Sequence, residues 1–226
     1  MDQRAKLYYF ADPMCSWCYG FAPVIDRIRT EYANGFDIRL VMGGLRPGKL
    51  AQQMTPAIGR VIRHHWREVA KMTAQKFDET FFDRENFNYD TEPASKAVIV
   101  MEQLAGEHAY DYYHEVQSAF YSRNQDVTAP AVLAEIAEKY GVAAEVFLQT
   151  YHSEAAHRET WDQFQFSAQL GIRGFPALVA EINQQFYLVT RGWQPYEQIQ
   201  AAIEQVLKTA TAAAAAGESC EIGKEC

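Results

Sequence analysis

The sequence of 226 residues predicts an α/β domain that an all-helical insertion divides into two parts. Strand and helix patterns alternate over residues 1–49 and return over 153–208, whereas 50–152 show only helical periodicity. A βαβ pattern before the insertion and a ββα pattern after it form one small sheet, so we expect a single discontinuous domain. Residues 209–226 are rich in alanine, glycine and glutamate and are expected to form a flexible tail.

The first part begins with a short aromatic strand. Lys6–Phe10 is predicted to be this buried strand, and apolar residues then recur at helical spacing until Gly35 ends the helix. Phe36–Met42 is rich enough in apolar and β-branched residues to form a second strand. Together these segments predict a βαβ unit.

The insertion is predicted to contain four helices and a short additional piece. Apolar residues share one face of the first helix: Ile58, Val61, Ile62, His65, Trp66 and Val69. The segments that follow are Ala94–Ala105, Tyr110–Tyr121, Val132–Tyr140 and the short Val146–Tyr151. No strand-like alternation longer than a few residues interrupts them.

The last part restores the α/β pattern. A helix over Glu154–Leu170 precedes two strands, Ala177–Ile182 and Phe186–Thr190, which we expect to form a hairpin. A final helix covers Tyr196–Leu207. This order completes the predicted ββα half of the sheet.

Composition and charge exclude several classes of function. Lysine and arginine number 21 against 29 aspartates and glutamates, a net charge of −8 that argues against nucleic-acid and anionic-membrane partners. No apolar run reaches the ~18 residues that a membrane span needs. The first residues lack the features of a signal peptide, so we expect a cytoplasmic protein whose four cysteines are not a disulfide scaffold.

The strongest chemical signal is a pair of cysteines at the junction between the first strand and helix. Two residues, Ser16 and Trp17, separate Cys15 from Cys18, a spacing that allows a disulfide. A helix N-terminus favours the thiolate of Cys15, which is the attacking form in thiol–disulfide exchange. Cys18 is expected one turn deeper as the resolving thiol. Half of a zinc site, or two core cysteines without function, are the alternatives.

A proline directly before the third strand is the second signal. A cis bond between Phe175 and Pro176 would turn the start of this strand toward the cysteine pair. The backbone of Phe175 would then pair with an extended substrate segment. The alternative is a trans proline that merely begins a strand.

These segments resemble the DsbA-like thioredoxin-fold oxidoreductases, and especially the FrnE-like branch. The resemblance covers essentially residues 5–208 and includes the insertion. The segments that carry it are Tyr9–Gly20, Ala119–Phe120 with Asp126–Thr128, Leu133, Ala137 and Gly141, and Leu170–Leu178. It implies a thioredoxin fold with the helical insertion between its βαβ and ββα halves. It also implies a protein-thiol oxidoreductase or isomerase in which Cys15 is the nucleophile, Cys18 its partner and Pro176 the cis-proline.

The sequence departs from the DsbA pattern at two places. DsbA has Pro-His between its cysteines, whereas this chain has Ser16 and Trp17, so we expect a less oxidising couple. Phe175 stands where many relatives carry threonine or valine, and its bulk is expected to narrow substrate choice. Ser16, Trp17, Phe175 and Pro176 are therefore the expected substrate-binding residues.

A second pair of cysteines lies in the tail. Cys220 and Cys226 are separated by five residues and are candidates for an accessory redox pair. The alternatives are two incidental cysteines, or a zinc site that combines all four cysteines. We expect no metal and no cofactor beyond the redox-active disulfide, with glutathione as a possible co-substrate.

Three functions remain open from the sequence. The leading hypothesis is disulfide exchange with protein or peptide thiols, together with a redox partner that the sequence does not identify. A glutathione-dependent isomerase or transferase of the kappa and 2-hydroxychromene-2-carboxylate isomerase type is the second, although these enzymes carry serine at the position of Cys15. A metal- or partner-binding module is the third. The sequence does not predict the direction of electron flow, the natural substrate or the oligomeric state.

Overall fold

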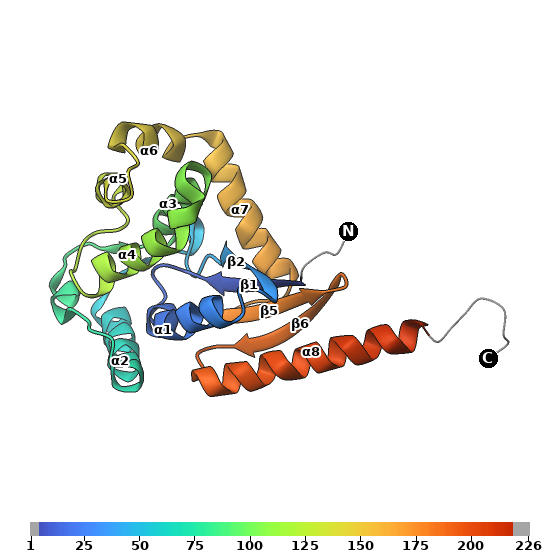
Figure 1. Ribbon diagram of the computed structural model, residues 1–226. Helices are drawn as coiled ribbons and strands as arrows, with labels where there is room; N and C mark the ends of the chain where they lie inside the picture. The colour runs from blue at the N-terminus through green and yellow to red at the C-terminus, as the bar shows by residue number, and fades with distance from the viewer. Residues whose placement is uncertain (1–4, 219–226) are drawn as a thin grey trace.

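The computed structural model describes residues 5–218 and contains a central sheet of four strands (Figure 1). The strands are β1 (Ala5–Ala11), β2 (Phe36–Met42), β5 (Ala177–Ile182) and β6 (Gln185–Arg191). Their order is β2-β1-β5-β6; β1 runs parallel to β2, and the other neighbours are antiparallel. The observed topology therefore has the predicted βαβ and ββα halves.

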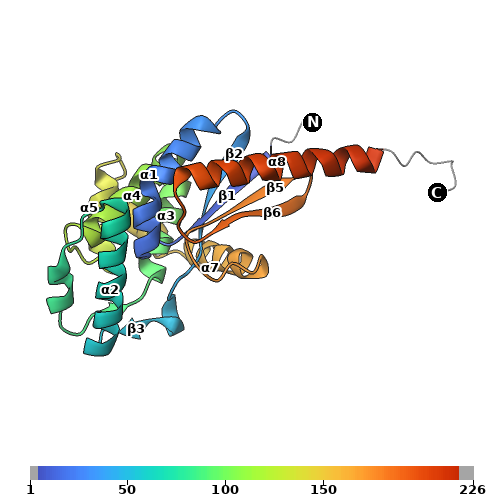
Figure 2. The same cartoon turned by 90° about the horizontal axis from the view of Figure 1, so that it is seen from below.

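Helices cover both faces of this sheet. Helices α1 (Ser16–Glu31) and α8 (Tyr196–Glu218) lie on one face, and α7 (Glu154–Gln169) lies on the other (Figures 1 and 2). Alternation along β1 explains the arrangement, because successive side chains of a strand point to opposite faces. Tyr9 is buried in the large core shared with α1, whereas Phe10 packs with Phe166 of α7.

The insertion consists mainly of helices that extend the core of the sheet domain. Its α-helices are α2 (Pro56–Thr73), α3 (Glu92–Ala105), α4 (Ala109–Tyr121), α5 (Pro130–Glu138) and α6 (Ala144–Tyr151). Three short 3-10 helices, η1 (Gly48–Leu50), η2 (Glu79–Asp83) and η3 (Gly106–His108), connect them. Helix α3 packs against both α7 and β2, and one cluster of buried side chains runs from the sheet into the insertion.

The prediction that the insertion is entirely helical is wrong at one place. Two-residue strands β3 (Gln52–Gln53) and β4 (Asn88–Tyr89) pair antiparallel to form a second, small sheet. Strands this short show no alternation of apolar and polar residues, so periodicity does not reveal them. The pairing nevertheless places Tyr89 beside the loop that leads into α1, where its hydroxyl bonds to the carbonyl oxygen of Met14.

The predicted buried face of α2 is partly wrong. Ile62, Trp66 and Val69 are buried, but Val61 is 58% exposed and His65 is also exposed. The buried positions are spaced by four and three residues, which gives a narrow stripe along the helix. Val61 and His65, which widen the predicted face of the helix, lie outside this stripe.

The last helix is longer than expected. Helix α8 continues to Glu218, whereas the flexible tail was predicted to begin at residue 209. Alanine has the highest helix propensity, so an alanine-rich segment prolongs the helix that precedes it. Within residues 5–218, no helix is both long and apolar enough to cross a membrane.

Candidate functional site

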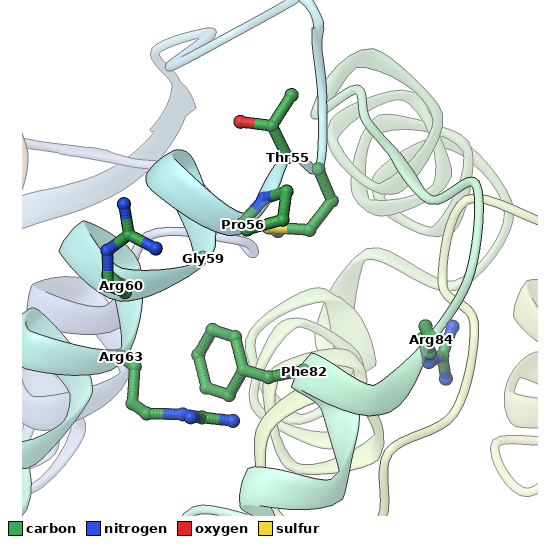
Figure 3. A pocket seen from close by; sticks show the side chains of 8 residues that line it. Thr55, Pro56, Gly59, Arg60, Arg63, Phe82 and Arg84 are labelled. Carbon is green, nitrogen blue, oxygen red and sulfur yellow. The ribbon is translucent and has the colours of Figure 1, made fainter.

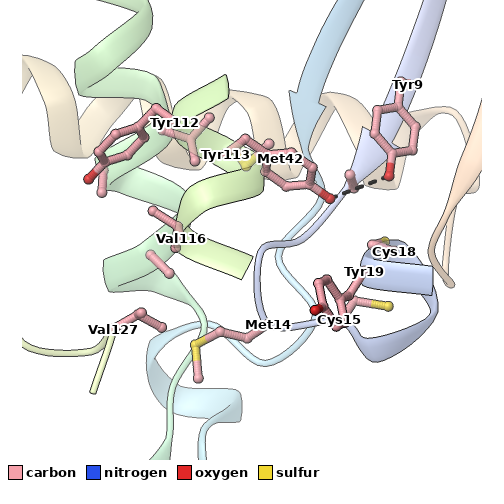
Figure 4. Close-up of a cluster of buried hydrophobic side chains, with 14 of the residues drawn as sticks. Tyr9, Met14, Cys15, Cys18, Tyr19, Met42, Tyr112, Tyr113, Val116 and Val127 are labelled. Carbon is pink, nitrogen blue, oxygen red and sulfur yellow. Dashed lines mark hydrogen bonds between the residues drawn. The ribbon is translucent and has the colours of Figure 1, made fainter. Parts of the chain in front are cut away.

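Cys15 and Cys18 lie where β1 passes into α1. Cys15 is the N-cap residue of α1, with an extended backbone (φ −94°, ψ 114°) and no side-chain cap, and the first turn carries no acidic residue. Both cysteines are free thiols and both are buried (Figure 4). The unpaired N–H groups of the helix start therefore face the Cys15 region without a competing carboxylate on that turn.

The two thiols occupy different environments. Cys15 lines a pocket, and its Sγ donates a 3.5 Å hydrogen bond to the carbonyl oxygen of Phe175. Cys18 lies behind it, and burial, followed by hydrogen bonding and charge interaction with Cys15, raises the pKa of Cys18 well above its ordinary value. An external substrate therefore meets Cys15 first, while Cys18 stays protonated until a reaction step removes its proton.

The segment before β5 faces this pair. The peptide bond between Phe175 and Pro176 is cis, as the sequence predicts. The carbonyl of Pro176 accepts a 2.8 Å hydrogen bond from the N–H of Gly192, so the segment is held at the end of the sheet. The Phe175 ring packs directly over Gly43, where a Cβ atom would lie 2.0 Å from Cε1 of the ring.

The pocket at Cys15 has a volume of about 220 Å³. Four predicted residues line it, namely Cys15, Ser16, Trp17 and Phe175. The sequence interpretation did not identify the remaining lining residues, which are Met14, Leu45, Arg46, Ile62, His65, Trp66, Tyr89 and Gly174. Leu45 and Arg46 come from the loop after β2, and α2 and β4 supply the four larger side chains Ile62, His65, Trp66 and Tyr89, so the insertion forms one wall of the pocket.

Asp12 organises the loop beside the cysteines. Its Oδ1 accepts a hydrogen bond from the N–H of Met14 (2.8 Å), and its Oδ2 accepts one from the N–H of Leu45 (2.7 Å). Burial raises the pKa of Asp12 to about 6, although these bonds and one from Thr91 act in the opposite direction. The carboxyl thus joins the loop after β1 to the loop after β2.

The insertion is hydrogen-bonded to both of these loops. Tyr89 donates from its hydroxyl to the carbonyl oxygen of Met14, the residue before Cys15, over 2.7 Å. Arg46 and Thr91 exchange two hydrogen bonds, from the N–H of Arg46 to Oγ1 of Thr91 (3.0 Å) and from the N–H of Thr91 to the carbonyl of Arg46 (3.2 Å). No short-range sequence signal predicts these contacts, because their partners lie far apart in the chain.

A second cavity, of about 310 Å³, lies at the start of α2 and contains no thiol (Figure 3). Three arginines, Arg60, Arg63 and Arg84, line it together with Phe82. Arg63 and Arg84 lie near acidic partners, since Arg63 is 3.6 Å from Glu79 and Arg84 is paired with Asp126 at 3.8 Å. The cavity is positively lined but lacks a group that performs redox chemistry.

The predicted accessory pair, Cys220 and Cys226, lies outside the described residues. The same is true of the alternative zinc site, which requires both tail cysteines. These predictions therefore stay untested.

The fold and site together define the class of protein. A four-stranded mixed sheet, a CxxC pair at the start of α1 and a cis-proline opposite it are the features of a thioredoxin-fold thiol–disulfide oxidoreductase. The model of the family described as DSBA-like thioredoxin domain matches residues 6–204. The chain belongs to this family.

Two solved structures resemble the chain over nearly its whole length. A Nitrosomonas europaea protein described as a candidate protein disulfide isomerase superposes with a TM-score of 0.83 at 35% identity, covering 92% of this chain and 99% of that one. The cytosolic disulfide reductase DsbM of Pseudomonas aeruginosa superposes with a TM-score of 0.73 at 26% identity, covering 90% and 99%. A 2-hydroxychromene-2-carboxylate isomerase shares only the fold, with 14% identity and a TM-score of 0.62.

The curated relatives that match this chain are named as adapter proteins and not as disulfide isomerases or reductases. A Halalkalibacterium halodurans protein named ClpXP adapter protein SpxH is 24% identical over 220 residues, which cover 91% of this chain and 71% of the relative. A Bacillus subtilis protein of the same name is 22% identical over 182 residues, covering 76% and 57%. This chain thus spans little more than half the length of the second relative.

Proposed function

We propose that this protein exchanges disulfides with protein or peptide thiols, with Cys15 as the nucleophile and Cys18 as the resolving thiol. The observation that carries the proposal is the asymmetry of the pair: Cys15 lines the pocket, and Cys18 is buried behind it. Pro176 and Phe175 hold the substrate, because the carbonyl of Phe175 already lies beside Cys15 Sγ. Ser16 and Trp17 form the adjacent wall.

The exchange proceeds in two balanced steps. The Cys15 thiolate attacks one sulfur of a substrate disulfide, which forms a mixed disulfide and releases the other sulfur as a thiolate. Cys18 then loses its proton and attacks Cys15 Sγ, which forms the Cys15–Cys18 disulfide and releases the second substrate thiol. The substrate has gained two electrons and the protein has lost two, so a thiol reductant completes the cycle.

Glutathione is the proposed reductant and the cytoplasm the proposed location. The P. aeruginosa DsbM, at 26% identity, is described as cytosolic and has also been solved with glutathione. We assign this chain to the FrnE-like branch on the motifs around its cysteines and Pro176. The direction of exchange follows from the potential of the pair relative to the glutathione pool.

A redox titration in glutathione buffers tests the proposal. The Cys15–Cys18 pair is scored by alkylation and mass spectrometry, and we expect one reversible two-electron transition. Replacing Cys15→Ser is expected to abolish turnover, and Cys18→Ser to trap a mixed disulfide on Cys15. Full activity of the Cys15→Ser variant would exclude the proposal.

The tail pair is tested in the same assay. A Cys220→Ser/Cys226→Ser double variant is expected to exchange disulfides with a slower re-reduction by glutathione if the pair relays electrons. An unchanged re-reduction rate would show that these cysteines are incidental. The titration midpoint of Cys15–Cys18 provides the control, because it does not depend on a relay.

A glutathione-dependent isomerase or transferase acting on a small molecule is the second candidate. The apolar walls of the Cys15 pocket, which include Trp17, Ile62 and Trp66, favour it. Such an enzyme needs no resolving thiol. Conversion of a small aromatic substrate with glutathione that persists in a Cys18→Ala variant would support this candidate over disulfide exchange.

An adapter role, suggested by the name of the curated relatives, makes a different prediction. Binding to a protein partner does not require a redox-active thiol. A Cys15→Ser variant that retained a partner complex but lost disulfide exchange would show that the two activities are separate.

A further inference from the structure

A row of polar side chains crosses the otherwise apolar core between the sheet and α4. Tyr9 of β1 and Tyr113 and Gln117 of α4 are fully buried. The hydroxyls of Tyr9 and Tyr113 are 3.3 Å apart, and Nε2 of Gln117 donates to Tyr113 over 2.9 Å. Figure 4 shows the two phenols meeting near Cys18. The two rings pack in the core, whereas their hydroxyls and the amide of Gln117 bond to one another.

The row continues to the surface through His114. Its Nδ1 lies 3.3 Å from Oε1 of Gln117, and its Nε2 lies 3.0 Å from Oδ1 of Asp26 on α1. Burial works to raise the pKa of Asp26, but the hydrogen bond and charge of His114, helped by Arg29, lower it below its ordinary value. Asp26 is therefore a carboxylate at neutral pH.

His114 links the two helices through its ring nitrogens, one beside the carboxylate of Asp26 and the other beside the amide of Gln117. Gln117 donates to the oxygen of Tyr113. The hydroxyls of Tyr113 and Tyr9 each carry one hydrogen, but a single hydrogen bond joins them. One of the two hydrogens therefore has no acceptor within the row.

Cys18 lies near the two hydroxyls (Figure 4), and its charge acts on both phenols. Burial raises the pKa of Tyr9 most, and the charge of Cys18 raises it further. The pKa of Tyr113 is raised first by burial, then by Tyr9 and then by Cys18. Both phenols therefore stay protonated and remain donors. The groups that face Cys18 are Cys15, Asp12, Tyr9 and Tyr113.

We propose that Tyr9, Tyr113, Gln117 and His114 position a hydroxyl hydrogen toward Cys18 and stabilise its thiolate while it resolves the mixed disulfide. This inference rests on the disulfide-exchange function proposed above. In the step concerned, Cys18 gives up its proton to solvent and attacks Cys15 Sγ, the bond from Cys15 to the substrate breaks, and the substrate sulfur leaves as a thiolate. These four side chains touch no substrate and are positioning residues; His114, held by Asp26 of α1, orients the amide of Gln117.

The two steps are measured separately with 5,5′-dithiobis(2-nitrobenzoate) as the disulfide. In a Cys220→Ser/Cys226→Ser background, which removes the two tail thiols, the reduced protein releases one coloured thiolate when Cys15 attacks and a second when Cys18 resolves. We expect Tyr9→Phe and Tyr113→Phe to leave the first phase unchanged and to slow the second by about tenfold, as expected for loss of a hydrogen bond to a charged group. Tyr112→Phe is the matched control, because this buried hydroxyl of α4 bonds instead to the carbonyl of Leu133 (2.9 Å).

The pH profile adds a readout that a merely structural role does not move. Without a hydroxyl that stabilises the Cys18 thiolate, the rise of the second-phase rate with pH should shift to higher pH in Tyr9→Phe and Tyr113→Phe. The titratable groups Cys15 and Asp12, which also face Cys18, are unchanged in both variants. His114→Gln keeps both hydroxyls and loosens only the contact to Gln117, so it should slow the second phase less than either phenol variant.

The outcomes distinguish this inference from the function on which it rests. An unmodified protein without a first phase would overturn both. A normal first phase with an unchanged second phase in Tyr9→Phe and Tyr113→Phe would overturn the positioning role alone. A normal first-phase rate also shows that each variant has folded, and His114→Gln, at a partly exposed position, serves if a phenol variant does not fold.

Discussion

Gly43 is the residue whose side chain the site excludes most strictly. It lies in the loop after β2, and the Phe175 ring occupies the space where its Cβ would be, with Cζ at 2.1 Å. The carbonyl of the same Phe175 accepts the hydrogen bond from Cys15. The absence of a side chain at position 43 therefore allows the Phe175–Pro176 segment to lie against Cys15.

Replacing Gly43→Ala should displace Phe175 and impair exchange. We expect kcat/KM for a peptide disulfide to fall by about tenfold or more, because small displacements near reacting atoms are costly. Overpacking should lower the free energy of unfolding by about 1–3 kcal/mol. Gly106→Ala is the control, since nothing lies within 4 Å of its added Cβ. Equal kinetics for the two variants would contradict this assignment.

Asp12 should give the stability of the protein a specific pH dependence. Burial raises its pKa from 3.8 to about 6, so the folded state binds more protons than the unfolded state between these values. The contribution of Asp12 is then fully present below about pH 4 and is lost as the pH rises through about 6. The difference corresponds to about 3 kcal/mol.

Urea unfolding of the unmodified protein and of Asp12→Asn measures this contribution. Between about pH 4 and pH 7, the unmodified protein should lose about 3 kcal/mol relative to the variant, whose amide does not titrate. The comparison removes the opposite contributions of other carboxylates. Parallel curves would mean that Asp12 has an ordinary pKa.

At the scale of elements, α2 connects the pocket to the aromatic core of the insertion. Trp66 lines the pocket and contacts rings from η2 and α4. Trp66→Ala should therefore lower the free energy of unfolding by about 3–5 kcal/mol, as measured by urea unfolding. Val61→Ala on the exposed side of the same helix should change it by less than about 0.5 kcal/mol. Similar losses for both variants would place Val61 in the core.

The same helix shows what the sequence can and cannot predict. Periodicity located α2 and its stripe, because a buried stripe repeats every three or four residues. It misassigned Val61 and His65, since a sequence does not show how wide the stripe is. Short strands such as β3 escape detection because two residues have no period.

The residues of the site also fall into those that the sequence indicates and those that it does not. Cys15, Cys18 and Pro176 were predicted because their chemistry is encoded by adjacent residues. Asp12 and the α2 wall of the pocket were not, because they act through partners many positions away. The polar row of Tyr9, Tyr113 and Gln117 is also invisible in the sequence, where the same residues look like ordinary members of a strand and a helix.

At the scale of the whole molecule, charge and an exposed edge should govern self-association. Strand β6 is an edge strand of the main sheet, and its Phe186 and Leu188 are 46% and 49% exposed. The net charge of −8 keeps copies apart at neutral pH, but this repulsion disappears near the isoelectric point of about 5.3.

Light scattering should therefore rise near pH 5.3 and fall again in a Leu188→Lys variant. An exposed surface substitution on another element, Val146→Lys on α6, controls for the change in net charge. Equal suppression by both variants would mean that charge alone, and not the edge of β6, controls association.

The hydrogen bond from Tyr89 to the carbonyl of Met14 has a consequence for protein engineering. Helical insertions of this kind invite exchange between relatives as a way of changing substrate choice. Here the insertion also holds the residue before Cys15 and, through Thr91, the loop after β2. A transplanted insertion would bring new walls to the pocket, but it would keep the cysteines in place only if it also carried a tyrosine and a threonine at these two anchoring positions.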